Sequence, residues 1–210
     1  MLRYFKPVVF LACLAPVGML VWRYFHAGLG ANPIEFITHS TGDWTLIFLL
    51  TTLAITPVRK LTHFYGLISF RRMLGLFAFF YGLLHLTTYV WLDKFFDLHE
   101  MLHDIAKRKF ITAGMTAFAL MIPLALTSTK WAIRKLGKRW QILHRLIYFS
   151  AAAGVIHYIW LVKADLRKPL EYATILAVLL SYRVVSWIAS RMSQAAKPRI
   201  QPTPSILSTK

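Results

Sequence analysis

The sequence has one cysteine and few acidic residues, and both shortages limit what the protein can be. Cys13 alone cannot form an intramolecular disulfide, and there is no thiolate cluster for zinc or an iron–sulfur centre. Only 8 Asp and Glu accompany 25 Lys and Arg, so the formal net charge is +17. A strongly basic surface can bind nucleic acid, but these charges lie between long apolar runs. We therefore assign them to the loops of a membrane protein and expect no nucleic-acid partner.

The sequence also lacks the loop motifs of soluble nucleotide enzymes and hydrolases. It contains no phosphate-binding loop, no dinucleotide fingerprint and no nucleophile elbow. It is instead rich in apolar residues: 57% are hydrophobic and the mean hydropathy is +0.53. A run of about 20 apolar residues spans the hydrocarbon core of a bilayer. The sequence therefore predicts an all-α integral membrane protein.

Six membrane-spanning helices are expected from the uncharged runs. The second is short and would have to cross steeply or thin the bilayer, and the fourth contains Pro123, which neighbouring helices can accommodate. Together they form one transmembrane domain over residues 1–190, and residues 191–210 are expected to be a short disordered tail. The expected spans are Pro7–Phe25, Asp43–Val58, Arg71–Leu92, Phe110–Ser128, Trp140–Val162 and Pro169–Ser190.

The distribution of Lys and Arg predicts the orientation of the chain. The amino terminus, the second loop, the fourth loop and the tail together hold 15 of the 25 basic residues, whereas the first loop, His26–Gly42, has none. Positively charged loops stay on the cytoplasmic side of a bacterial inner membrane. Both termini are therefore predicted to be cytoplasmic, and the first, third and fifth loops to face outward.

Three of the eight histidines, His85, His144 and His157, fall inside expected spans, where an ionisable side chain indicates function. His85 lies about 20 Å from the cytoplasmic start of the third span, and His157 lies about 20 Å up the parallel fifth span. Two imidazoles at one level can bind a haem iron from both sides. Packing or hydrogen bonding is the simpler explanation for a buried histidine. We favour haem for His85 and His157 because their depths match.

His144 marks a second level, close to the cytoplasmic side. It lies 13 residues before His157, which places the two about 140° apart on an ideal helix. A distortion near Gly154 would be needed to bring both to one face. On the third span Arg71 points the same way as His85, so a second haem at His144 would have an open axial position, a water, or Arg71 beside it. Arg71 can equally pair with a haem propionate.

Two other readings remain open. The segment His99–His103 (HEMLH) matches the zinc-protease pattern of two histidines one turn apart with a glutamate that activates water. It lies in a charged outer loop without an obvious third ligand, where an amphipathic interfacial turn is the simpler explanation. The other reading is a channel or transporter lined by the buried histidines and arginines.

A membrane haem protein needs a source of electrons, and the chain holds no flavin or nicotinamide domain. The donor must be a membrane quinol, a bound flavin or a separate reductase. The basic loops TPVRK, SFRR and KWAIRKLGKRW could hold a flavin phosphate or an acidic partner, although setting the orientation explains them more simply.

Several segments together resemble one known family. GLGANPIEF, LLTTLAITPVRK, RRMLGLFAFFYGLLHLTTYVWLD, ALTSTKWAIRKLGKRWQILHRLIYF and IHYIWLVK occur in the order and spacing of the MsrQ family, also called YedZ. The resemblance covers roughly Gly28–Lys163. It includes LHLT around His85, LGKRWQxLHxxxY around His144 and IHYxW around His157. The tail and the HEMLH loop lie outside it.

The resemblance implies a function. Members of this family are haem-binding inner-membrane subunits of the periplasmic methionine sulfoxide reductase system, with a ferric-reductase-like six-helix bundle. The resemblance implies b-type haem with His85, His144 and His157 as its histidines, and an associated FMN. It also implies that electrons pass from the quinone pool to MsrP, a soluble molybdopterin enzyme that repairs oxidised methionine in periplasmic proteins. On this reading the chain is a redox subunit and not the catalytic reductase.

Overall fold

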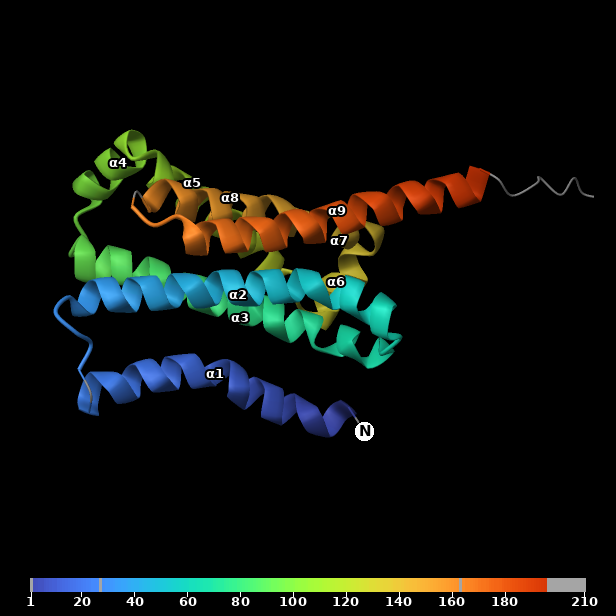
Figure 1. Cartoon of the computed structure of the whole chain (residues 1–210), viewed down its shortest axis with the longest axis horizontal. Helices are drawn as coiled ribbons and strands as arrows, with labels where there is room; N and C mark the ends of the chain where they lie inside the picture. Colours follow the sequence, from blue (N-terminus) through green and yellow to red (C-terminus); the bar gives the residue numbers. More distant parts are fainter. Residues whose placement is uncertain (1, 27, 163, 196–210) are drawn as a thin grey trace, which may run out of the picture.

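The computed structural model describes residues 2–26, 28–162 and 164–195, and the chain is a helical bundle (Figure 1). Six segments of these residues are long and apolar enough to cross a membrane, as the sequence predicts. They consist mainly of α1 (Leu2–His26), α2 (Pro33–Thr62), α3 (Arg71–Thr87), α5 (Lys109–Leu126), α8 (Leu146–Leu161) and α9 (Arg167–Ala195). The shorter elements are η1 (Tyr65–Ser69), the π-helix η2 (Thr88–Asp93), α4 (Leu98–Lys107), α6 (Lys130–Leu136) and α7 (Lys138–Leu143).

The second span is longer than the sequence indicated, and the expected start at Asp43 is wrong. Helix α2 begins at Pro33, because Asn32 caps it by accepting a hydrogen bond from the Glu35 amide at 3.3 Å. Proline suits this first helical position since its missing N–H would have no partner there. The 30-residue helix therefore needs no thinning of the bilayer, and it carries His39, which we had expected in a loop.

The fifth span is two helices and not one. The helix is interrupted by a turn at His144–Arg145 between α7 and α8, whereas α8 continues without interruption past Gly154. The expected distortion thus exists, but it lies ten residues earlier than Gly154. His144 and His157 consequently belong to different helices, and the angle between them on an ideal helix does not apply.

Two antiparallel helix pairs, α2–α3 and α5–α8, make the most extensive contacts in the bundle, and α9 packs beside α2 and α8 (Figure 1). Their shared core includes Leu53, Ala78 and Ala151, all fully buried. Helix α1 touches the bundle more lightly and is bent (Figure 1), as expected for a helix with Pro16 in its interior. At this bend the Tyr81 hydroxyl donates to the Cys13 carbonyl at 2.8 Å and accepts from the Val17 amide at 3.2 Å. The hydroxyl thereby bridges a carbonyl and an amide one turn apart in α1 and ties this helix to α3.

The two ends of the bundle differ in charge. We call the end with α4 and the starts of α2 and α9 the acidic end, because all eight Asp and Glu lie in that half. The opposite end, with the end of α2, the start of α3, α6 and α7, is the basic end; the positive charge predicts that it faces the cytoplasm. Helix α9 continues past Ser190 to Ala195, and the rest of the expected tail, residues 196–210, lies outside the described residues.

Candidate functional site

His85 of α3 and His157 of α8 face each other across the bundle, toward the acidic end. Their ring centroids are 6.0 Å apart and the ring planes are inclined by 80°. The structure therefore brings together the two histidines that the depth argument placed at one level. A first-row metal binds an imidazole nitrogen at about 2 Å, so two rings on opposite sides of one metal atom have centroids about 6 Å apart. The spacing of the two rings fits one metal atom between them.

Backbone carbonyls fix which nitrogen of each ring is free. Nδ1 of His85 lies 2.9 Å from the Thr38 carbonyl oxygen, and Nδ1 of His157 lies 2.6 Å from that of Phe110. A carbonyl only accepts, so each Nδ1 carries the proton and donates it. Each Nε2 is left with its lone pair, which is the tautomer a metal ligand requires.

Two glycines make room for the imidazole rings. A Cβ built on Gly114 of α5 would lie 2.7 Å from Nδ1 of His157, and one on Gly42 of α2 would lie 3.1 Å from Cε1 of His85. Each ring therefore packs directly against the backbone of a neighbouring helix, on the same side as its hydrogen bond. Backbone and carbonyl together hold each ring in one orientation.

A cavity of about 500 Å³ surrounds the two histidines. This volume lies within the range of about 300–1,000 Å³ that is usual for cofactor and ligand sites. Toward the acidic end the lining is polar and includes Asn32, Glu35, His39, Asp43 and Arg108. The remaining wall is mainly apolar and includes Leu46, Leu49, Leu86, Phe110, Phe118 and Met121.

His144 does not line this cavity and lies toward the basic end, as the sequence indicated. Its ring stacks on Trp140 at 3.8 Å, and Nε2 lies 3.0 Å from the Thr127 hydroxyl. Arg71, the first residue of α3, lies at the same end of the bundle. The structure thus places His85 and His157 at one level, as expected, whereas Nε2 of His144 is hydrogen-bonded to the Thr127 hydroxyl.

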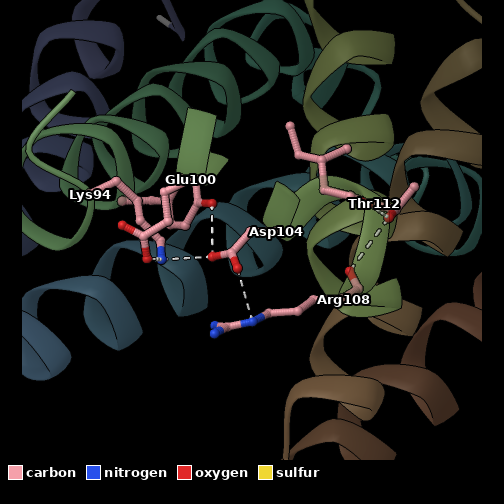
Figure 2. Close-up of polar contacts among 7 residues, drawn as sticks. Lys94, Glu100, Asp104, Arg108 and Thr112 are labelled. Carbon is pink, nitrogen blue, oxygen red and sulfur yellow. Dashed lines mark hydrogen bonds and ion pairs between the residues drawn. The ribbon is translucent and has the colours of Figure 1, made fainter. Parts of the chain in front are cut away.

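The HEMLH segment forms part of α4 and serves an ion-pair network at the acidic end. Asp104 lies between Lys94 at 2.7 Å and Arg108 at 3.1 Å, and Glu100 also pairs with Lys94 (Figure 2). His99 and His103 are exposed, and Glu100 is engaged by Lys94. Within residues 2–26, 28–162 and 164–195, no three His, Cys, Asp or Glu side chains gather to hold a metal ion. This geometry gives the zinc-protease reading no support.

Replacement of Asp104 by asparagine is expected to lower the stability of the protein. Lys94 and Asp104 are buried, and the variant leaves the ammonium with Glu100 alone, which we expect to cost about 1–2 kcal/mol. A thermal melt followed by tryptophan fluorescence measures it. Asp165→Asn is the control, because its pair with Arg167 is exposed and 3.9 Å long, so the melting temperature should hardly move. Equal shifts in the two variants would contradict the role given to the network.

The same network predicts how the difference in stability between wild type and Asp104→Asn depends on pH. Hydrogen bonds from Lys94 hold the pKa of Asp104 below its ordinary 3.8, and hydrogen bonds to Asp104 and Glu100 hold the pKa of Lys94 above its ordinary 10.5. Because the carboxyl pKa is lower in the folded protein, Asp104 stabilises the fold when the pH is above its pKa in the unfolded chain. This stabilisation is lost as the pH falls through its pKa in the folded protein. Lys94, whose pKa is raised in the folded protein, stabilises the fold when the pH is below its pKa in the unfolded chain. This stabilisation is lost as the pH rises through its pKa in the folded protein. The gap between wild type and Asp104→Asn should therefore persist from about pH 5 to pH 9 and close in stronger acid.

Sequence reasoning missed the two glycines and the two carbonyls that hold the rings. A glycine inside a helical pattern costs stability and so suggests close packing, but the sequence does not say against which helix. Gly42 was also hidden because α2 was expected to begin after it. The polar lining from Asn32, Glu35 and His39 was missed for the same reason.

Comparison with known proteins identifies the family of the chain and several similar proteins. Residues 40–155 match the family described as ferric reductase like transmembrane component. The chain is 56% identical over 186 residues to the "Protein-methionine-sulfoxide reductase heme-binding subunit MsrQ" of Herminiimonas arsenicoxydans, covering 87% of this chain and 85% of that protein. Proteins of the same name from Azospira oryzae and Rhodospirillum rubrum are 50% and 52% identical, covering 94% and 92% of this chain and 87% and 94% of theirs. No solved structure matches the chain.

Proposed function

We propose that this chain, a multi-pass inner-membrane protein of the MsrQ family, binds b-type haem between His85 and His157. The haem would carry electrons across the membrane. One observation carries the proposal: two imidazoles 6.0 Å apart, with each Nδ1 on a carbonyl, leave both Nε2 lone pairs for one metal. The relatives' printed name, a haem-binding subunit, supports it.

The residues of the cavity fit a haem. Apolar side chains such as Leu46, Phe118 and Met121 suit the faces of the macrocycle, and the polar lining suits its propionates. Arg108, held by Asp104, and Asn32 are the side chains we assign to the propionates. When bound, the iron takes up and releases one electron. The work of the chain is to hold the two rings in one tautomer and to keep the iron in an apolar setting, which together tune the potential.

The direction of electron flow follows from the two ends. We propose that electrons enter from the quinone pool or from a cytosolic flavin reductase near the basic end, with FMN as an associated cofactor. They leave near the acidic end, where His85 and His157 lie, to a periplasmic molybdopterin reductase of the MsrP type that repairs oxidised methionine. The chain is then a redox subunit without a sulfoxide-reducing site of its own. His144 and Arg71 are the side chains that we assign to a second haem.

Reconstitution tests this function. The purified protein is placed in liposomes, a reduced quinone analogue is added, and the Soret and α bands report haem reduction. Reoxidation is expected only when a periplasmic methionine sulfoxide reductase and a sulfoxide substrate are both present. Purified protein without a Soret band would refute the proposal, and a haem-to-protein ratio of one would refute the second haem. Flavin released on denaturation measures FMN.

The orientation of the two rings gives a further prediction. Imidazole planes inclined by 80° leave the two iron orbitals that interact with them nearly equal in energy. The oxidised protein should therefore give a low-spin electron paramagnetic resonance signal with one very large g value, and not the rhombic signal of parallel rings. Absence of the low-spin signal would show that one of the two histidines is not a ligand. The measurement needs only the purified oxidised protein.

A further inference from the structure

Three arginines converge at the basic end, and no carboxylate of the described residues pairs with them. Arg59 comes from the end of α2, Arg71 from the start of α3 and Arg183 from α9. Helices α2 and α9 are in contact here, since Lys60 of α2 donates to the Ser186 hydroxyl of α9 at 2.9 Å. The electrostatic effect of Arg59 and Arg183 on Arg71 agrees with this placement. All eight acidic residues lie in the other half of the bundle, and none of them pairs with these arginines. Like charges gathered this way repel one another unless an anion lies between them.

A proline explains why Arg183 points inward. Pro57 has no N–H, so the Leu53 carbonyl one turn earlier lacks its helical partner. Nη2 of Arg183 donates to that oxygen at 2.9 Å, and the guanidinium lies over the ring of Tyr148 at 5.0 Å. The side chain is thus held at this site by two contacts, neither of which neutralises its charge.

Several donors of this cluster remain without a partner in the protein. Nε of Arg183, Nε of Arg59 and the hydroxyl of Ser69 are buried atoms with no hydrogen bond to any described residue. Buried polar atoms are nearly always paired, and leaving one unpaired costs about 1–3 kcal/mol. Ser69 ends η1, which packs against α2 and directly precedes the start of α3 at Arg71. Three unpaired donors at the end of the bundle where three arginines gather indicate that they serve a ligand.

We propose that Arg59, Arg183 and Ser69 form a binding site for a phosphate group. The planar fork of arginine matches phosphate oxygens, and a serine hydroxyl can donate to the same group. The site lies at the end of the bundle, where helices α2 and α3 reach the membrane surface. The phosphate belongs either to the headgroup of an anionic phospholipid or to a soluble phosphomonoester. None of the three residues lines the His85–His157 cavity, so the site is separate from the haem proposed between these two histidines.

The test compares two double variants of the full-length protein in detergent. Arg59→Gln/Arg183→Gln removes both forks, and Arg72→Gln/Arg191→Gln removes the same charge from exposed arginines of α3 and α9. Thermal midpoints are measured while short-chain phosphatidylglycerol, phosphatidylcholine, FMN, riboflavin or inorganic phosphate is titrated. A ligand that binds only the folded protein raises the midpoint. We expect the phosphate-bearing anion to raise it in wild type and in the control, with half-saturation at least tenfold higher in Arg59→Gln/Arg183→Gln.

The outcomes separate the sources and the alternatives. A response to phosphatidylglycerol and not to phosphatidylcholine identifies a lipid headgroup, whereas a response to FMN or phosphate and not to riboflavin identifies a phosphomonoester. Equal responses of the two double variants, or no response in wild type, overturn the proposal. Loss of haem without a change in the phosphate response would also overturn it, because the arginines would then serve haem carboxylates.

A lysine pair covers the case in which the glutamine variant does not fold. Arg59→Lys/Arg183→Lys keeps both charges but loses the forked geometry, so weaker binding by several fold is expected relative to Arg72→Lys/Arg191→Lys. If the two lysine variants bind equally, the site has no arginine-specific geometry and the proposal fails.

Discussion

A His85→Ala variant is expected to lose the haem held between α3 and α8. The substitution removes one of two axial nitrogens, and the remaining ring, fixed by its bond to the Phe110 carbonyl, cannot move across to compensate. Loss of a metal ligand is a larger change than loss of a supporting contact, for which tenfold to hundredfold weaker binding is usual. We expect haem content at this site to fall by more than 90% and its low-spin signal to disappear. Pyridine haemochrome analysis of purified protein measures it.

The pair should behave as a unit. His157→Ala is expected to have the same effect as His85→Ala, and the double variant should lose little more than either single one, because one missing ligand already destroys the site. His103→Ala is the matched control, since His103 lies exposed on α4 and should leave the Soret band unchanged. Full haem content in His85→Ala, or additive losses in the double variant, would refute ligation by this pair.

The sequence was sufficient to predict the level of this pair, and the reason is physical. Helices rise by a constant amount per residue, so depth can be counted from the charged end of each span. His85 and His157 both come from helices that start at the basic end, and the count placed them together. The direction in which a side chain points around its helix is harder to predict, because it changes wherever the helix is interrupted. The break at His144–Arg145 did so, and the angle between His144 and His157 could not be predicted.

Contacts between helices were beyond the sequence. Glu35 and His39 gave the start of α2 the composition of a polar loop, and the Asn32 cap was overlooked. The polar end of the cavity was therefore invisible. The carbonyls of Thr38 and Phe110 could not be predicted at all, since every residue has one and only packing selects which meets a ring. The convergence of Arg59 and Arg183, 124 positions apart in the chain, likewise depends on how α9 packs on α2.

Replacing Gly114 by alanine is expected to expel most of the haem while the bundle stays folded. In an ordinary helix this change gains about 0.5–1 kcal/mol, because alanine is the better helix former. Here the new Cβ would lie 2.7 Å from Nδ1 of His157, so the ring must move and its 2.6 Å bond to the Phe110 carbonyl must stretch or break. Both the position of Nε2 and the tautomer are then lost, and we expect haem affinity to fall at least tenfold.

A series of three glycines tests whether that loss arises from the contact with the ring. Gly42→Ala should have a smaller effect, since its Cβ would lie 3.1 Å from the His85 ring, a distance that a slight shift relieves. Gly75→Ala of α3 is the control, because its Cβ would meet only Thr52 at an ordinary 3.7 Å, and it should retain haem and melt no lower than wild type. Haem titration of the three purified variants, with melts of their haem-free forms, separates binding from folding. If packing against the rings causes the loss, haem affinity falls in the order Gly75→Ala, Gly42→Ala, Gly114→Ala. Equal affinities would mean that the rings are free to move and that the glycines do not position them.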